Sequence, residues 1–217
     1  MRYKCLVFDH DDTVVNSTAT IHHPCFEEYL KLRRPGMSCT LENYLLRNFT
    51  PGFLEMCRQD YGLSDEDLNE EGEFWKEYVL DHIPVVYPGI AEIMRLQREQ
   101  GGLICVASHS MDRYIYRDYE KNGLPRPDAV YGWEHPEEHR KPNPFPLTDI
   151  MERFSLSPGE LLMIDDLKPG YDMAKSAGVD FAAVGWSNDL EPIESFMRRN
   201  SQFYFKSVEE LRQFLFS

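Results

Sequence analysis

The chain has 217 residues, of which 42% are hydrophobic and 13% aromatic, and its 37 acidic and 23 basic residues give a net charge of −14 at pH 7. This composition can fill a hydrophobic core and excludes a disordered chain, and the lack of a basic tract argues against nucleic-acid binding. We expect a globular protein with one domain, or one domain that carries a large insertion.

Neither the start of the chain nor its cysteines indicate a membrane or secreted protein. No run of eighteen apolar residues occurs, and acidic residues follow Phe8 where a signal peptide would continue its apolar stretch. The five cysteines are widely spaced and form no Cys-x-x-Cys motif, which argues against a disulfide framework and a structural zinc cluster. We therefore expect a cytoplasmic protein without a membrane span, and the sequence leaves its oligomeric state open.

Short apolar runs at 3–8, 103–107 and 161–164 predict strands that are buried on both faces of a sheet. Shorter runs at 129–131, 181–184 and 203–205 predict further strands. Helical patterns lie between the runs, and the capping-box pattern Ser207-x-x-Glu210 predicts a last helix. The alternation of strand and helix predicts an α/β fold of the Rossmann-like kind, with a parallel sheet between two helical layers.

Residues 16–86 break this alternation. Helical patterns occur at 23–33, at 41–61 with an interruption at Pro51-Gly52, and at 64–81, and no buried-strand run occurs among them. We therefore expect an α/β core made of residues 1–15 and 87–217, with a helical subdomain at 16–86 inserted after the first strand.

Polar side chains follow three of the predicted strands, at the point where each strand ends. Asp9 and Asp11 follow the first strand, Ser108 follows the second, and Asp165 and Asp166 follow the third. Ligands of such sheets bind outside the carboxyl ends of the strands. The sequence therefore predicts that these groups converge at one edge of the sheet.

The residue types at this edge suit the chemistry of a phosphate group. Two carboxylates that are two residues apart allow one to attack while the other moves protons. Ser108 could offer its hydroxyl and nearby backbone N–H groups to a phosphate oxygen. Lys141 lies in a loop with prolines at 142 and 144, which would hold its ammonium group in place.

Two adjacent acids at the end of an apolar strand are costly to bury unless a positive group neutralises them. A divalent cation would do so, and Mg²⁺ commonly takes one or two carboxylates, water and a substrate phosphate. Asp165 and Asp166 therefore predict a magnesium site.

In this order the residues resemble the four motifs of the haloacid dehalogenase (HAD) superfamily of hydrolases. The matching segments are Asp9-x-Asp11-x-Thr13-Val14, Ser108, Lys141 before Pro-x-Pro, and Asp165-Asp166 followed by a helix that ends at Ala177-Gly178. The insertion falls where members similar to phosphoglycolate phosphatase and beta-phosphoglucomutase carry a helical cap. The resemblance implies a HAD-like core with such a cap.

The resemblance also implies a role for each residue. Asp9 would be the nucleophile that forms an aspartyl-phosphate, and Asp11 would protonate the leaving oxygen and then activate water. Ser108 and Lys141 would bind the phosphoryl oxygens. Together with a metal ion, Lys141 would explain how a chain with net charge −14 binds an anion.

The implied Mg²⁺ ligands are Asp9, the backbone carbonyl of Asp11, and Asp166, with Asp165 in support. In the inserted helices, Arg47 is a candidate for contact with a carboxylate or sugar of the substrate.

A carboxylic acid two residues after the nucleophile favours a phosphotransferase over a dehalogenase, because a halide leaves without a proton. We therefore expect a Mg²⁺-dependent phosphatase that acts on a small phosphorylated metabolite. The alternatives are a sugar phosphomutase of the beta-phosphoglucomutase kind, or a non-catalytic member of the fold that binds a ligand or partner. Departures from the family pattern keep the last alternative open: Asp12 replaces a usual Gly, His109 a commoner Asn or Ser, and Gly170 a frequent second acid.

Overall fold

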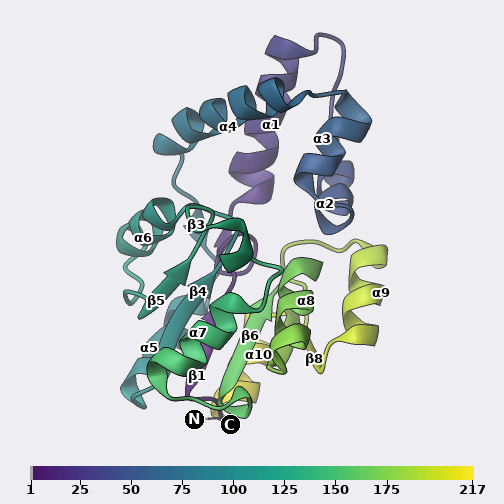
Figure 1. Cartoon of the computed structure of the whole chain (residues 1–217). Coiled ribbons are helices and arrows are strands. Elements are labelled where there is room, and N and C mark those ends of the chain that lie inside the picture. The colour runs from purple at the N-terminus through teal and green to yellow at the C-terminus, as the bar shows by residue number, and fades with distance from the viewer. Residues whose placement is uncertain (1) are drawn as a thin grey trace. The chain divides into compact units, whose positions relative to one another are not determined.

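The computed structural model describes residues 2–217, which form two compact units (Figure 1). The core unit consists of residues 2–16 and 85–217, and the helical unit consists of Ser17–Pro84. Residues 16, 85 and 86, which the sequence pattern assigns to the insertion, belong to the core unit. The reason is a two-stranded antiparallel ribbon that the pattern does not reveal, in which β2 (Val15–Asn16) pairs with β3 (Val85–Val86).

The core unit is built on a parallel six-stranded sheet, which confirms the predicted α/β class. Its strand order is β5-β4-β1-β6-β7-β8. The strands are β1 (Cys5–Phe8), β4 (Leu103–Ala107), β5 (Ala129–Tyr131), β6 (Leu161–Asp165), β7 (Asp180–Val184) and β8 (Phe203–Phe205). The first strand is central, with β4 and β6 as its parallel neighbours. The segments that follow β4, β1 and β6 therefore begin side by side at one edge of the sheet, although they are far apart in the sequence.

All four residues of β1 are buried, as expected of a strand covered on both faces. The helices are α5 (Ile90–Glu99), α6 (Asp112–Lys121), α7 (Phe145–Phe154), α8 (Lys168–Ala177), α9 (Glu191–Asn200) and α10 (Val208–Phe216). Residues Leu6 and Phe8 share a buried apolar cluster with side chains of α5, α6 and α10, whereas α7 packs against α8. The capping box at Ser207 and Glu210 forms as the sequence predicts.

The helical unit contains η1 (Thr18–His22), α1 (His23–Arg33), α2 (Leu41–Phe49), α3 (Phe53–Tyr61) and α4 (Asp65–Leu80). The predicted break between α2 and α3 occurs at Gly52, whose φ of 113° is in the region that favours glycine. The unit buries a cluster of its own, with Phe26, Tyr29 and Leu30 among its members. In residues 2–217, no helix has both the length and the apolar character needed to cross a membrane.

Glu71 is buried in the helical unit, and no ion pair is found for it among the described residues. Burial raises its pKa to about 7, and nearby His22 lowers it only in part. An unfolded glutamate has a pKa of about 4.3. Between these values the folded protein holds a proton that the unfolded chain has lost, so the free energy of unfolding falls as the pH rises through this window.

We expect Glu71→Gln to stabilise the protein by about 3 kcal/mol at pH 8 and to change little near pH 4.5. Urea denaturation of both proteins at several pH values measures this difference. Glu77→Gln, an exposed change on the same helix, is the matched control. A stability gain from Glu71→Gln that is independent of pH would contradict the prediction.

Candidate active site

The carboxyl ends of β1 and β6 bring three carboxylates together at one edge of the sheet. Oxygen atoms of Asp9, Asp165 and Asp166 all lie within 4.8 Å of one another, and all three side chains are buried. The backbone N–H of Asp9 donates to the carbonyl of Ile164, at 2.8 Å, and this bond fixes the first carboxylate beside β6. Strand pairing thus produces the convergence that the sequence predicts.

The loop after β1 makes a tight turn around His10. The carbonyl oxygen of His10 accepts hydrogen bonds from the N–H groups of Val14 and Val15, at 2.9 and 3.1 Å. Asp12 has a φ of 57°, and its N–H donates to the Val15 carbonyl at 2.8 Å. Aspartate is one of the few residues with a side chain that tolerate this left-handed conformation. The turn therefore forms although the usual glycine is absent at position 12.

Lys141 supplies the cation of the site. Its ammonium Nζ lies 2.7 Å from Oδ1 of Asp9 and 2.8 Å from Oδ2 of Asp165, and its side chain is 4% exposed. Burial alone would lower the pKa of Lys141, but the carboxylates of Asp165 and Asp9 outweigh this effect and hold it above its ordinary value. The ammonium group therefore stays charged between the two carboxylates.

Asp165 occupies the space that a side chain at position 170 would need. Its Oδ1 accepts a hydrogen bond from the N–H of Leu167, at 2.7 Å, while its Oδ2 contacts Lys141. A Cβ atom on Gly170 would lie 2.0 Å from this Oδ2, well inside van der Waals contact. The departure at Gly170 thus has a steric reason, because the site takes its acid from the strand end instead of from the helix.

Asp166 is the acid that most needs a positive partner. Its Oδ1 accepts a hydrogen bond from the hydroxyl of Thr13, at 3.2 Å, and the residue is 2% exposed. Burial, followed by the charges of Asp12, Asp165 and Asp9, raises the pKa of Asp166 well above its usual range. Oxygen ligands that crowd together in this way fit a hard divalent cation such as Mg²⁺.

Ser108 and Ser110 form the polar loop after β4. The N–H of Ser108 donates to the carbonyl of Tyr131, at 3.0 Å, and the N–H of Ser110 donates to Oγ of Ser108, at 3.2 Å. These two N–H groups are therefore already used, because they continue the pairing of β4 with β5 and close the loop. The hydroxyl hydrogen of Ser108 is still available to a ligand.

Ser110 is a site residue that the sequence reasoning missed. Its Oγ donates to Oδ2 of Asp11, at 2.5 Å, and thereby orients this carboxylate. A second hydroxyl two residues after Ser108 was the signal that could have found it.

His109 joins this loop to the lysine segment. Its Nε2 lies 3.0 Å from the backbone carbonyl of Lys141, so this nitrogen carries the hydrogen, and its ring packs edge-on against Trp133. An unusual residue at this position therefore has a role in holding the two loops of the site together.

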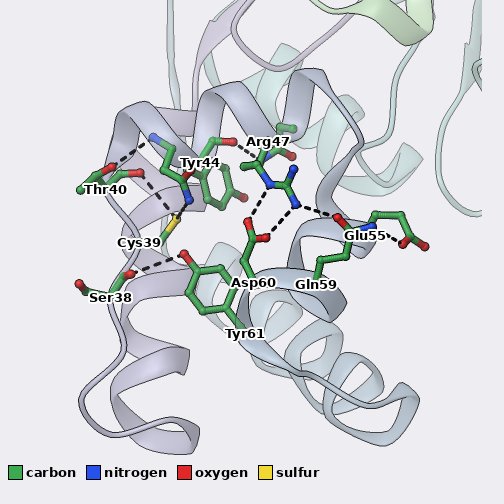
Figure 2. A network of polar contacts seen from close by, with 11 residues as sticks. Ser38, Cys39, Thr40, Tyr44, Arg47, Glu55, Gln59, Asp60 and Tyr61 are labelled. Atoms are coloured by element: carbon green, nitrogen blue, oxygen red, sulfur yellow. Dashed lines mark hydrogen bonds and ion pairs between the residues drawn. The ribbon is translucent and has the colours of Figure 1, made fainter.

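Arg47 lies in the helical unit and is already paired (Figure 2). Its Nε and Nη2 donate to the two carboxylate oxygens of Asp60, at 2.7 and 2.8 Å, and Nη2 also donates to Gln59, at 2.9 Å. These bonds tie α2 to α3. Its Nε and Nη2 are therefore engaged within the helical unit, and contact between Arg47 and a substrate stays a prediction.

Comparisons with known proteins agree with the architecture. The sequence profile of the haloacid dehalogenase-like hydrolases matches residues 6–184. The phosphoglycolate phosphatase of Pseudomonas putida is 24% identical over 204 residues, which cover 88% of this chain and 73% of that protein. The phosphoglycolate phosphatase of Vibrio parahaemolyticus is 28% identical over 156 residues, which cover 67% of this chain and 65% of that protein.

Solved structures show the same fold. One from Bacteroides fragilis, described as a haloacid dehalogenase-like hydrolase, has a TM-score of 0.81 and 21% identity, and the match covers 96% of this chain and 99% of that one. A HAD family hydrolase from Deinococcus radiodurans, with bound phosphate and sodium, has a TM-score of 0.72 and 18% identity, with coverages of 99% and 95%. The profile match extends over most of the core strands and the whole helical unit, so this chain belongs to the haloacid dehalogenase-like hydrolases.

Proposed function

We propose that the protein is a Mg²⁺-dependent phosphatase that hydrolyses a small phosphorylated metabolite through an aspartyl-phosphate. The observation that carries this proposal is the position of the Lys141 ammonium between Asp9 and Asp165, with Asp166 in the same cluster. Phosphoryl transfer depends mainly on positioning and on charge neutralisation, and this cluster suits both. Two relatives named phosphoglycolate phosphatase support the reaction class.

Two chemical steps follow from these positions. In the first, an oxygen of Asp9 attacks phosphorus, the bond to the leaving oxygen breaks, and Asp11 gives that oxygen a proton. In the second, Asp11 takes a proton from water, the water oxygen attacks the same phosphorus, and Asp9 is released with inorganic phosphate. Lys141 and the hydroxyl of Ser108 hold the phosphoryl oxygens, and Ser110 keeps Asp11 oriented.

The residues that would hold Mg²⁺ are Asp9, Asp166 and the backbone carbonyl of Asp11, with Asp165 in support. When bound, the ion neutralises the clustered carboxylates and polarises the phosphoryl group. Asp166 must lose its proton to act as a ligand, so the affinity for Mg²⁺ should rise with pH.

The helical unit would serve as a cap that excludes water from the first step and selects the substrate. Its place in the sequence, between β2 and β3 of the core unit, supports this role, because one paired ribbon carries both connections.

Release of inorganic phosphate tests the proposal. The substrates are p-nitrophenyl phosphate and a panel of small phosphoesters that includes phosphoglycolate, each with Mg²⁺ and with EDTA. We expect release that requires Mg²⁺. Isomerisation of a sugar phosphate without phosphate release would favour the mutase alternative, and no turnover of any compound would favour a binding protein.

A further inference from the structure

A buried hydrogen bond joins the loop that follows β1 to helix α6. His10, between the proposed nucleophile and the proposed acid, is 1% exposed, and its Nε2 lies 3.1 Å from Oδ2 of Asp118 on α6. Because a carboxylate only accepts, this nitrogen carries the hydrogen. The ring also stacks on Tyr119, with 5.9 Å between the ring centroids.

The carboxylate of Asp118 is held from a second side. The residue is 3% exposed, its Oδ1 accepts a hydrogen bond from Nε of Arg117 at 2.8 Å, and Nη2 of the same arginine forms an ion pair with this oxygen at 2.7 Å. Tyr119, the next residue along α6, belongs to the buried apolar cluster of the core unit. A buried charge in such surroundings gives little net stability, but it fixes geometry, because hydrogen bonds are directional whereas apolar contacts are not.

The bond joins two segments whose relative position matters for the proposed reaction. His10 is the centre of the turn after β1, since its carbonyl accepts the N–H groups of Val14 and Val15. Asp118 is on the helix that begins immediately after the Ser108–Ser110 loop. The same two segments are joined a second time by the bond from Ser110 to Asp11.

We propose that the His10–Asp118 pair has a positioning role. It fixes the loop that carries Asp9 and Asp11 relative to the loop that carries Ser108. His10 touches no reacting atom and transfers no proton in this role. The inference rests on the proposed phosphatase activity and adds two positioning residues to it.

Matched substitutions at position 10 separate positioning from packing. His10→Leu keeps a similar volume and removes the donor, whereas His10→Gln keeps a donor near the place of Nε2. We expect His10→Leu to lower kcat for p-nitrophenyl phosphate by about 10- to 100-fold with little change in KM, the size found when an interaction that orients catalytic groups is lost. We expect His10→Gln to restore most of kcat, with the pH profile of the wild type.

Two further variants test whether a loss of kcat in His10→Leu comes only from a loss of stability. Ile115→Ala weakens packing of the same helix without touching the pair, and it should lower Tm while kcat at 25 °C stays near the wild-type value. In the double variant His10→Leu/Asp118→Leu no unpaired carboxylate remains at this place, so stability should recover in part while kcat stays low.

Full kcat in folded His10→Leu would overturn the positioning role. Recovery of kcat in the double variant would also overturn it, because His10 would then serve only to satisfy the buried carboxylate of Asp118. If His10→Leu does not fold, the double variant and His10→Gln still decide between these outcomes. Failure of the proposed function is distinct, since the wild-type protein would then release no phosphate from any compound.

Discussion

Asp9→Asn should abolish phosphate release, with kcat lower by on the order of 10⁴-fold or more, because the change removes the nucleophile. The amide has nearly the size of the carboxylate, and its oxygen can still accept a hydrogen bond from Lys141. We therefore expect the variant to fold. Single-turnover kinetics with p-nitrophenyl phosphate and a thermal unfolding curve measure the two effects separately.

Asp172→Asn is the matched control for this prediction. Asp172 is on α8, is partly exposed, and pairs with Lys168 away from the carboxylate cluster. The same chemical change at this position should leave kcat near the wild-type value. Retained turnover in pure Asp9→Asn protein, or an equal loss in Asp172→Asn, would contradict the assignment of Asp9 as nucleophile.

Among the variants considered, Lys141→Met should destabilise the protein most. It should also lower kcat/KM by about 10²- to 10³-fold, because it removes a charge that binds the phosphoryl group. Removing the ammonium leaves the carboxylates of Asp9 and Asp165 buried without their common cation. Breaking one side of a buried ion pair costs about 3–5 kcal/mol. Urea denaturation and steady-state kinetics check these two expectations.

The pH dependence of this loss has a definite sign. In the wild type, burial raises the pKa of Asp165 to about 7, although Lys141 opposes the rise. Without the lysine, the buried carboxyl group of Asp165 holds its proton still more tightly than the same group does in the unfolded chain, so stability is lost as the pH rises. The destabilisation by Lys141→Met should therefore be larger at pH 8 than at pH 6.

Lys141→Arg provides the comparison that separates charge from geometry. It keeps a cation between the two acids, so it should retain more stability than Lys141→Met, while its different shape should still lower kcat/KM. Equal stability of Lys141→Met and the wild type at pH 8 would contradict the view that Lys141 neutralises the buried carboxylates of Asp9 and Asp165.

The strands, and the residues at their ends, were predictable because the signals are local. A run such as Cys5–Phe8 has no alternation, so it must be covered on both faces, and its burial confirms this. The acids after such a strand then fall at the carboxyl edge of the sheet, where a parallel fold binds its ligands. The α/β class and the position of the carboxylate cluster follow from this reasoning alone.

The contacts between side chains were not predictable, because they join residues that are distant in the sequence. A second hydroxyl after Ser108 could mark Ser110 as a site residue, but it did not show that Asp11 would be its partner. Nothing near position 170 showed that Asp165 would fill its space. The antiparallel pairing of β2 with β3 is likewise missing from the predicted elements, since two residues are too few to show a period.

By itself, the sequence determined the order of strands and helices, the inserted helical segment and the residue types at the sheet edge, because hydrophobic periodicity and turn chemistry are properties of neighbouring residues. Only the tertiary structure decided that Lys141 would lie between Asp9 and Asp165, that Arg47 would pair with Asp60, and that His10 would be held by Asp118. Each of these contacts depends on distances of a few ångströms between segments that only the packed sheet and helices bring together.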